Sequence, residues 1–495
     1  MIQTSVLVHT KDTTQATVVS SSPSNKATGG VETAAMFTSP CVSVVVAALL
    51  LVGVTADTPA SCLYSDVQGS WTFYEGERNL DNTATCDSFD AVQTVTVDLT
   101  YPNIATDQFG NVGTWTLIYN QGFEVTVNGR SYFAFSYYTS DNGTVTSICD
   151  RTFNGWSHDV TQRHWSCYYG VKNSPVSKKT HEDPFAAKPQ LMAQIVDVLQ
   201  ETRLVTEINK SQKLWKAKVY DKFVGMTREE LINMAGGKST WLAERPGPAP
   251  VTAELKRRAS YLPRQWDWRD VDGVNYVSPV RNQGNCGSCF AFSAAGMLEA
   301  RIRIQTNSTQ QPVFSPQDVV SCSPLDQGCS GGFAYLVAGR YGKDYGLVEE
   351  SCSPYVGSNT ECSTNVTCTR HYSSAYEFIG GYYGGCNEVL MQEALIQNGP
   401  LSVDFMVYDD FRAYTSGVYK HVESTTRSDF NPLVSVSHSV LLVGYGVDEA
   451  SGEKYWIVKN SWGGDWGDAG YFKILRGTNE CGIESIAFQA TPIPA

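Results

Sequence analysis

The sequence of 495 residues has no run of lysine and arginine longer than a few residues, and its formal net charge is −13 at pH 7. This balance argues against nucleic acid or an anionic membrane as a partner. The few histidines, among them His371, His421 and His438, show no metal-ligand spacing with one another or with cysteine pairs. A glycine loop of the nucleotide-binding kind is also absent. Nucleic-acid-binding, metal-dependent and nucleotide-dependent classes are therefore disfavoured.

Long hydrophobic runs are equally scarce. Residues 41–54 form an apolar stretch of fourteen, which is too short to span a bilayer comfortably. The stretch ends in Val54-Thr55-Ala56, with small or aliphatic residues at the two positions that a signal peptidase reads. We expect a signal peptide cleaved after Ala56; the alternative is a short membrane anchor. Residues 1–35 show no sustained period and are expected to be disordered or absent from the mature protein.

Cysteine, in contrast, is plentiful: the chain has 14. Cysteine usage of this kind and several N-x-S/T sequons indicate the secretory route. The sequons lie at Asn142, Asn209, Asn307 and Asn365. Because the pI near 5.1 suits an acidic compartment, we expect a lysosomal protein, with secretion as the alternative.

The length predicts about three domains, and residues 57–175 read as the first after the leader 1–56. Apolar and polar residues alternate along several short segments, and turn residues separate them at the spacing of an antiparallel meander. The segments are 93–99, 113–119, 123–127 and 132–138. This pattern predicts a small β-barrel. It contains four cysteines, which allow three disulfide connectivities.

Residues 176–261 differ in composition. Their sequence is polar and rich in lysine, with glycine and proline clusters near 236–238 and 246–250. The pattern predicts a helix over 191–199 and a possible second over 201–215. The glycines and prolines mark exposed linkers, which a removable pro-segment needs. The remaining domain, 262–495, carries the motifs for chemistry.

The stretch from Gln283 to Ser293 reads as a nucleophile site. Gly287 and Ser288 predict a turn, and the small and apolar residues that follow predict a buried helix starting at Cys289. A helix N-terminus stabilises a thiolate. Gln283 is placed to donate an amide N–H to the same carbonyl oxygen as the Cys289 N–H, forming an oxyanion hole. The alternative is that Cys289 is half of a disulfide.

The motif Cys286-Gly287-Ser288-Cys289-Phe290 resembles the C-G-S-C-[WY] signature of the papain-like cysteine peptidases, with Phe in place of Trp or Tyr. In that family the histidine and asparagine follow far downstream, and here His438 and Asn460 lie 149 and 171 residues after Cys289. The resemblance implies that Asn460 orients the His438 ring and that Trp462 shields their hydrogen bond. Ser437 stands where these enzymes often carry asparagine.

The first domain carries a second resemblance. Residues 57–62, 118–124 and 155–160 are similar to the exclusion domain of the cathepsin C family of dipeptidyl peptidases, which ordinary papain-like endopeptidases lack. The two resemblances together cover about residues 57–495. The alternative for the barrel is a generic ligand-binding module fused to a peptidase.

The resemblance implies further features of the site and the covalent structure. The glycines Gly331 and Gly332 would let an extended substrate approach the backbone closely. Phe333, Tyr335 and Phe378 match chloride-binding positions, the last being Tyr in relatives. The implied disulfides are Cys62–Cys149, Cys86–Cys167, Cys286–Cys329, Cys322–Cys362 and Cys352–Cys368, which leave Cys386 and Cys481 as buried free thiols beside Cys289.

We therefore expect an α+β chain: an antiparallel barrel, a removable pro-segment and a two-lobed papain-like domain, cut into a heavy chain (about 262–427) and a light chain (about 428–495). The expected activity is a cysteine exopeptidase that releases dipeptides from free N-termini, with Asp57 holding the substrate's α-ammonium group. The resemblance also implies chloride as cofactor and a homotetramer. The alternatives are a papain-like endopeptidase with an accessory barrel and a non-enzymatic binding protein.

Overall fold

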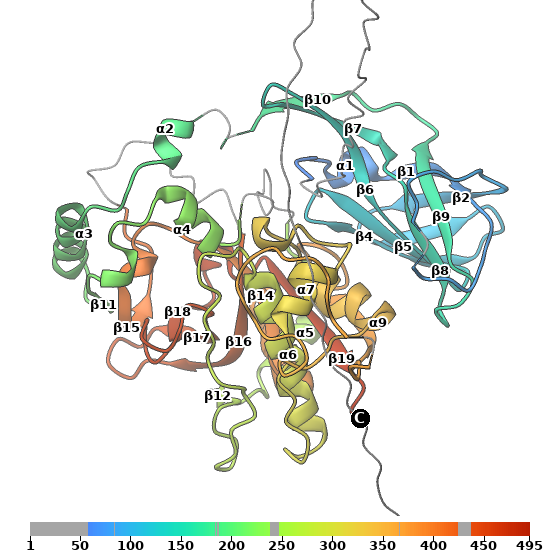
Figure 1. Cartoon of the computed structure of the whole chain (residues 1–495). Helices are drawn as coiled ribbons and strands as arrows, with labels where there is room; N and C mark the ends of the chain where they lie inside the picture. The colour runs from blue at the N-terminus through green and yellow to red at the C-terminus, as the bar shows by residue number, and fades with distance from the viewer. Residues whose placement is uncertain are drawn as a thin grey trace, which may run out of the picture. The chain divides into compact units, whose positions relative to one another are not determined.

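A computed structural model (Figure 1) describes residues 58–495, apart from 84, 184, 186–187, 238–246, 366 and 424–436. The expected signal segment and Asp57 lie outside these residues. Within the described part of the chain, no helix has the length and apolar character needed to cross a membrane.

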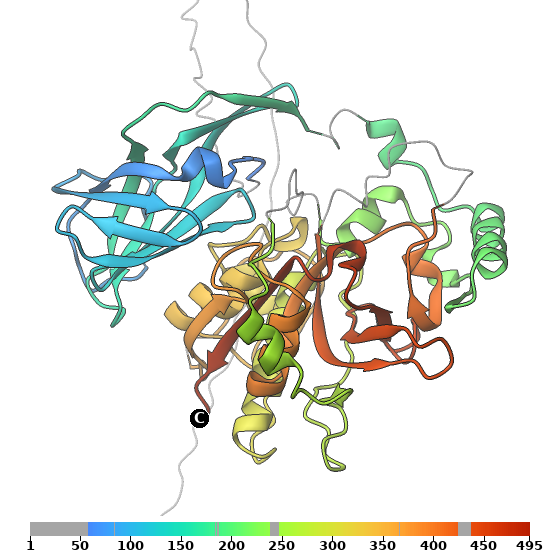
Figure 2. The same ribbon diagram turned by 180° about the vertical axis from the view of Figure 1, so that it is seen from behind.

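The first described unit is an antiparallel β-barrel, drawn in blue to teal in Figures 1 and 2. The strand order is β1-β2-β3-β4-β5-β6-β8-β9, and β9 pairs again with β1, so the sheet closes. The short helix α1 (Tyr64–Val67) precedes it. The strands are β1 (Gly69–Glu75), β2 (Gln93–Thr100), β3 (Ile104–Asp107), β4 (Val112–Ile118), β5 (Gly122–Val127), β6 (Arg130–Asp141), β7 (Thr144–Thr152), β8 (Gly155–Asp159), β9 (Ser166–Lys172) and β10 (Lys179–Glu182).

The barrel follows from the alternation of its residues. In β1, Trp71 and Phe73 are fully buried while their neighbours are partly exposed, so every second side chain enters the core. Trp71 packs on Phe123 of β5, and Phe73 packs on Tyr132 of β6. The predicted β-barrel is confirmed.

The segment 176–261 is folded against the rest of the chain. Its elements are α2 (Pro189–Met192), α3 (Val198–Ser211), β11 (Trp215–Ala217), the 3-10 turn η1 (Asp221–Phe223), α4 (Arg228–Met234) and α5 (Ala253–Ala259). The helix predicted over 191–199 is wrong. The Asp197 side chain accepts hydrogen bonds from the N–H groups of Leu199 and Gln200 and begins α3 there, so the chain between α2 and α3 is not helical.

The segment 262–495 has a helical lobe and a β-rich lobe. Its long helix α6 (Cys289–Gln305) packs on β16 and β19 of a mixed sheet with the order β11-β15-β18-β17-β16-β14-β19-β13, while β12 pairs with β16. The predicted α+β class is confirmed. The other elements are β12 (Trp266–Asp267), α7 (Pro316–Cys322), η3 (Gly328–Ser330), α8 (Ala334–Leu336), η4 (Val337–Tyr341), α9 (Gly342–Asp344), β13 (Ser373–Phe378), α10 (Glu388–Asn398), β14 (Leu401–Met406), η5 (Phe411–Ala413), β15 (Tyr414–Tyr419), β16 (Ser437–Val447), β17 (Lys454–Lys459), β18 (Tyr471–Leu475), η7 (Glu480–Gly482) and β19 (Ile486–Pro492).

Each disulfide lies within the barrel unit or within the segment 262–495. The structure has the same five pairs that the family resemblance implied: two within the barrel and three within 262–495. Cys289, Cys386 and Cys481 form no disulfide and are buried. Among the described residues, therefore, no disulfide joins the barrel to the segment 262–495.

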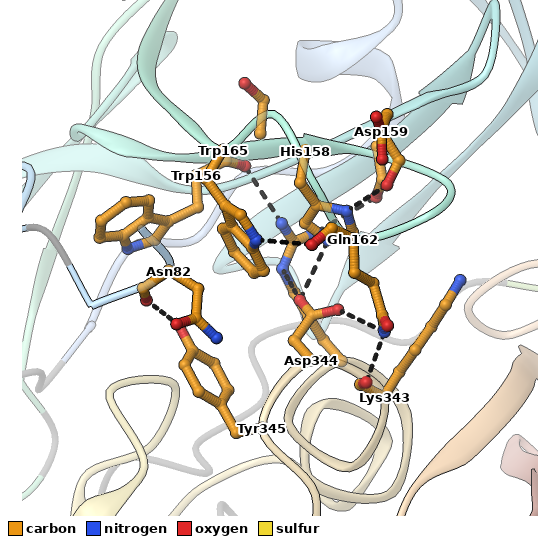
Figure 3. Close-up of polar contacts among 12 residues, drawn as sticks. Asn82, Trp156, His158, Asp159, Gln162, Trp165, Lys343, Asp344 and Tyr345 are labelled. Atoms are coloured by element: carbon orange, nitrogen blue, oxygen red, sulfur yellow. Dashed lines mark hydrogen bonds and ion pairs between the residues drawn. The ribbon is translucent and has the colours of Figure 1, made fainter. Parts of the chain in front are cut away.

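Polar contacts join the barrel to the helical lobe instead. Figure 3 shows His158, at the end of β8, facing Asp344 of α9, with 3.0 Å between Nε2 and Oδ2. The Gln162 side chain donates to the backbone carbonyl of Lys343. Both members of the His158–Asp344 pair are buried. A buried charged or polar pair of this kind is costly to break by removal of one member.

Candidate active site

Cys289 is the first residue of α6, and its side chain is fully buried. The thiol lies at the positive end of the helix dipole, where a negative charge on sulfur is favoured. The backbone N–H of Ser439, the residue after His438, lies 3.4 Å from the Cys289 Sγ atom. Strand β16 therefore brings the predicted histidine to the predicted nucleophile.

His438 is held by Asn460 across the β16–β17 region. The imidazole Nε2 lies 2.9 Å from Asn460 Oδ1, and that oxygen also accepts the N–H of Ser461 at 2.8 Å. Since Oδ1 can only accept, Nε2 carries the proton and Nδ1 keeps its lone pair. Among the described residues Nδ1 has no hydrogen-bond partner. His438 is thus oriented with a basic nitrogen available for a proton.

Trp462 covers this pair. Its ring stacks on the His438 ring, with centroids 5.2 Å apart and an interplanar angle of 27°. Stacking excludes water from one face of the imidazole and strengthens the hydrogen bond to Asn460. The position matches the shielding that the sequence resemblance implied for Trp462.

Gln283 is fixed at both ends of its amide. Its Oε1 accepts the hydroxyl of Ser461 at 2.5 Å, and its Nε2 donates to the carbonyl oxygens of Cys286 and Met234 at 2.9 and 3.2 Å. The amide N–H therefore already binds a carbonyl oxygen beside the nucleophile. An oxyanion hole needs such a donor, aimed and held before the reaction.

Burial sets the charge state of the cysteine–histidine pair in this structure. Loss of solvent raises the pKa of the Cys289 thiol to about 12 and lowers the pKa of the His438 imidazole to about 4, with only partial compensation from the hydrogen bonds of Ser439 and Asn460. Both shifts disfavour charge. The covered site therefore holds a neutral thiol and a neutral imidazole. The thiolate–imidazolium pair stays a prediction for the uncovered site.

The cover comes from the end of α4. The Met234 carbonyl accepts hydrogen bonds from the Gln283 amide and from the Trp462 indole, at 3.2 and 3.1 Å. A Cβ atom added to Gly237 would lie 2.2 Å from the Ser330 carbonyl oxygen. This backbone therefore lies directly against residues 328–332, the Gly-rich wall of the site. Residues 234–237 thus cover the face of the site formed by Gln283, Trp462 and Ser330.

The glycines predicted to accept substrate are also closely packed against neighbouring side chains. A Cβ atom on Gly332 would lie 2.7 Å from both the Phe290 ring and the Asp326 side chain. The Phe290 ring is therefore fully buried beneath this wall. Gly331 has φ of 129°, a conformation that favours glycine. Close packing explains Gly332 independently of any substrate.

The three positions matched to chloride binding lie together. The Tyr335 and Phe378 rings stack with centroids 4.0 Å apart, and Phe333 stacks on Tyr119 of the barrel. The Tyr335 hydroxyl donates to the buried carboxylate of Glu124 at 3.1 Å. The hydrogen of that hydroxyl is therefore already donated to a carboxylate of the protein.

Sequence reasoning missed one carboxylate beside the nucleophile. Asp404 lies in β14, directly opposite Ser439 in β16, and its Oδ1 accepts the Ser439 hydroxyl at 2.6 Å. The Tyr119 hydroxyl of the barrel donates to Oδ2. The available signal was an aspartate in the mostly apolar run of 401–406.

The thiol, the imidazole and the two side-chain amides that lie together here are the groups that acyl transfer requires. No cluster of side chains among the described residues could hold a metal ion. The four sequon asparagines are exposed, although the Asn209 side chain bonds both ways to the Ala217 backbone. Asp57 lies outside the described residues.

Two family models match the chain. "Papain family cysteine protease" matches residues 262–491, and "Cathepsin C exclusion domain" matches residues 57–172. The chain is 43% identical over 461 residues to "Cathepsin C" of Schistosoma mansoni, covering 92% of this chain and 98% of that protein.

Other relatives match a smaller share of the chain. The "Gut-specific cysteine proteinase" of Caenorhabditis elegans is 33% identical over 317 residues, covering 59% of this chain and 90% of the relative. The solved structure "proCathepsin B S9 from Trypanosoma congolense" has 30% identity and a TM-score of 0.48, covering 59% of this chain and 98% of that one.

Proposed function

The chain belongs to the cathepsin C family of papain-type cysteine proteases, and on that premise we propose that Cys289, His438, Asn460 and Gln283 carry out its dipeptidyl exopeptidase reaction. The observation that carries this assignment is the contact set at the nucleophile. Strand β16 places Ser439 against the Cys289 sulfur, and Asn460 fixes the adjacent imidazole.

In the proposed mechanism the Cys289 sulfur attacks the carbonyl carbon of the substrate's second peptide bond, and His438 Nδ1 takes the thiol proton. The oxyanion is held by the Gln283 amide and the Cys289 backbone N–H. Collapse breaks the C–N bond, and the imidazolium returns the proton to the leaving amine. Water, deprotonated by His438, then attacks the thioester carbon. The C–S bond breaks to release the dipeptide, and the imidazolium returns its proton to the Cys289 sulfur.

The length of the product follows from the N-terminal end of the site. We assign Asp57, the first residue after signal cleavage, to the substrate's α-ammonium group. Cys62 lies five residues on, and its disulfide to Cys149 limits how far the terminal segment can move. With the amine held and the barrel blocking extension, only the second peptide bond reaches Cys289.

A pair of dipeptidyl substrates that differ only in a free or acetylated N-terminus tests this assignment. The processed enzyme should cleave the free form and leave the acetylated form almost untouched, because the desolvated ammonium–carboxylate pair is lost. Asp57→Ala should raise the transition-state free energy for the free form by about 2–5 kcal/mol and lower kcat/KM accordingly. Equal cleavage of both forms would favour an endopeptidase with an accessory barrel.

Segment 176–261 is assigned as an inhibitory pro-segment, because the Met234 carbonyl accepts hydrogen bonds from the side chains of Gln283 and Trp462. The intact precursor should react with a small thiol alkylator at least about tenfold more slowly than the processed enzyme, since burial holds Cys289 as a neutral thiol. Mass spectrometry of the active form should show cleavage near the 176 and 261 boundaries. Full activity with an intact segment would contradict this role.

Family membership is consistent with chloride dependence. The groups present here fit chloride only in part, since the Tyr335 hydroxyl donates to Glu124 and Phe378 has no hydroxyl. We propose that any chloride at Phe333, Tyr335 and Phe378 is held by backbone N–H groups. No step of the mechanism depends on it.

The family relationship supports a lysosomal or secreted protein, and we propose the lysosome as the main location and a homotetramer as the mature assembly. The division into heavy and light chains is proposed near residue 427, which lies outside the described residues. Peptides and proteins with free N-termini are the partners.

A further inference from the structure

Arg412 is a cation of the peptidase segment that binds a carboxylate of the proposed pro-segment. It lies in the turn η5, and its side chain is 5% exposed. Its Nε donates to Glu201 Oε2 of α3 at 3.0 Å, and a terminal nitrogen of the guanidinium donates to Oε1. The two groups therefore meet in the forked, two-bond geometry that arginine forms with carboxylates.

Contacts within the peptidase segment fix the position of this guanidinium. Its other terminal nitrogen donates to Asp409 Oδ1 at 2.8 Å, and the Arg412 carbonyl accepts the Trp466 indole at 3.0 Å. The neighbouring Phe411 ring is fully buried and packs on the Trp462 ring, with centroids 5.6 Å apart. Excision of the pro-segment removes none of these contacts. The mature enzyme thus keeps an oriented guanidinium, two of whose nitrogens have lost the acceptor seen here.

A cavity links this guanidinium to the catalytic histidine. Its volume is about 240 Å³, and both Arg412 and Trp462 line it. The Trp462 ring also stacks on the His438 ring. Leu231 of the pro-segment forms part of the cavity wall, and with Arg412 it also lines a second cavity beside Glu201. When the pro-segment leaves, the two cavities become one groove that leads from Trp462 to Arg412.

This groove lies on the leaving-group side of the scissile bond. In the proposed mechanism the His438 imidazolium returns its proton to the leaving amine, so the residue that carries this amine lies beside the imidazole. Trp462 covers that imidazole and borders the groove. Because one small cavity touches both Trp462 and Arg412, a single side chain of the leaving residue spans the distance between them. This step rests on the proposed dipeptidyl reaction.

We propose that Arg412 is a specificity-determining residue that selects substrates with aspartate or glutamate as the first residue after the scissile bond, which is the third from the free N-terminus. The carboxylate of Glu201 occupies this guanidinium in the precursor, and the substrate's carboxylate takes its place in the mature enzyme. A neutral side chain of the same shape cannot accept both charged hydrogen bonds, so the site discriminates against it.

The test compares two peptides with free N-termini, Ala-Phe-Glu-Ala-Ala-amide and Ala-Phe-Gln-Ala-Ala-amide, which differ only in the charged group of the third residue. Chromatography of the released Ala-Phe gives kcat/KM for each peptide. The processed enzyme should prefer the glutamyl peptide by at least about tenfold, the effect of a hydrogen bond between charged groups. A ratio near or below one in the parent enzyme would overturn the proposal without any variant.

Arg412→Gln should reduce the ratio to about one, because glutamine keeps hydrogen-bond donors but carries no charge. This substitution is combined with Glu201→Gln, so that the precursor does not bury an unpaired carboxylate. Excision then removes residue 201, and the processed enzyme differs from the parent only at residue 412. Glu201→Gln alone is the matched control, since its processed form has the parent's sequence and should show the parent's ratio. Lys420→Gln, which removes an exposed cation just after β15, should also leave the ratio unchanged.

Arg412→Lys separates charge from geometry. Lysine keeps the charge without the fork, so a preference for the glutamyl peptide should remain but be smaller than in the parent. Titration of Cys289 with a thiol alkylator gives the concentration of folded enzyme in each sample.

If Arg412→Gln slows both peptides equally and keeps the ratio, the arginine only supports the surrounding structure, and the specificity role is wrong. Failure of the proposed function gives a different result. In that case the acetylated and free forms of the glutamyl peptide would be cleaved at equal rates, whatever residue 412 is.

Discussion

Replacing Cys289 by serine is expected to lower kcat/KM by at least about 10⁴-fold, the range seen when a catalytic nucleophile is removed. The serine hydroxyl is a much weaker nucleophile than a cysteine thiolate, because it stays protonated near neutral pH. Dipeptidyl turnover by the processed variant is the measurement. The variant should also fail to take up a thiol alkylator at this position.

The other two free cysteines are the matched controls. Cys386 donates to the Glu484 carbonyl at 3.0 Å and Cys481 lies beside Glu480, so neither has a described contact with the site. Cys386→Ser and Cys481→Ser should retain most of the turnover. Near-normal activity of Cys289→Ser, or loss of activity only in one of the control variants, would transfer the nucleophile role away from Cys289.

Removing the Gln283 amide is expected to lower kcat by about 10² to 10³-fold, the usual effect of losing one oxyanion donor. The amide is held by Ser461 before substrate arrives, so it contributes without reorganisation in the transition state. KM should change much less than kcat, because the ground-state carbonyl gains little from the same donor. Steady-state kinetics of Gln283→Ala on the free-amine substrate measures both constants.

Gln311→Ala provides the control for Gln283→Ala. Gln311 is exposed, lies beyond the end of α6, and bonds only locally to the Ser308 carbonyl. Its loss should leave kcat within about twofold, as expected for a surface substitution. An effect of Gln283→Ala confined to KM would assign the amide to substrate binding instead of to the oxyanion.

The parts of the fold that could be predicted from sequence are those that a local pattern determines. Alternation along 93–138 predicts the strands of the barrel, since each strand buries one face. The small-residue run after Cys289 predicts α6, since that helix is buried on all faces. The break between α2 and α3 is not predicted, because apolar residues continue on both sides of Asp197, whose side chain caps the start of α3.

Contacts between distant segments carry no local signal. Asp404 and Tyr119 are separated by 285 residues and meet only because β14 and the barrel fold against each other. Met234 likewise reaches Gln283 from a different segment. The charge state of Cys289 depends on this cover, so a motif alone predicts a reactive thiol where the covered structure favours a neutral one.

The absence of a disulfide between the barrel and the peptidase segment in the described chain has a consequence for the mature enzyme. Once the pro-segment is excised, the group proposed to hold the substrate amine and the group that attacks the carbonyl belong to different polypeptides. The proposed mature enzyme is then a complex of separate polypeptides, and contacts such as His158–Asp344 contribute to its dissociation constant. Dilution below that constant would release the barrel and leave an open cleft able to cut internal bonds. Subunit affinity would then determine whether the protease cleaves terminal or internal peptide bonds.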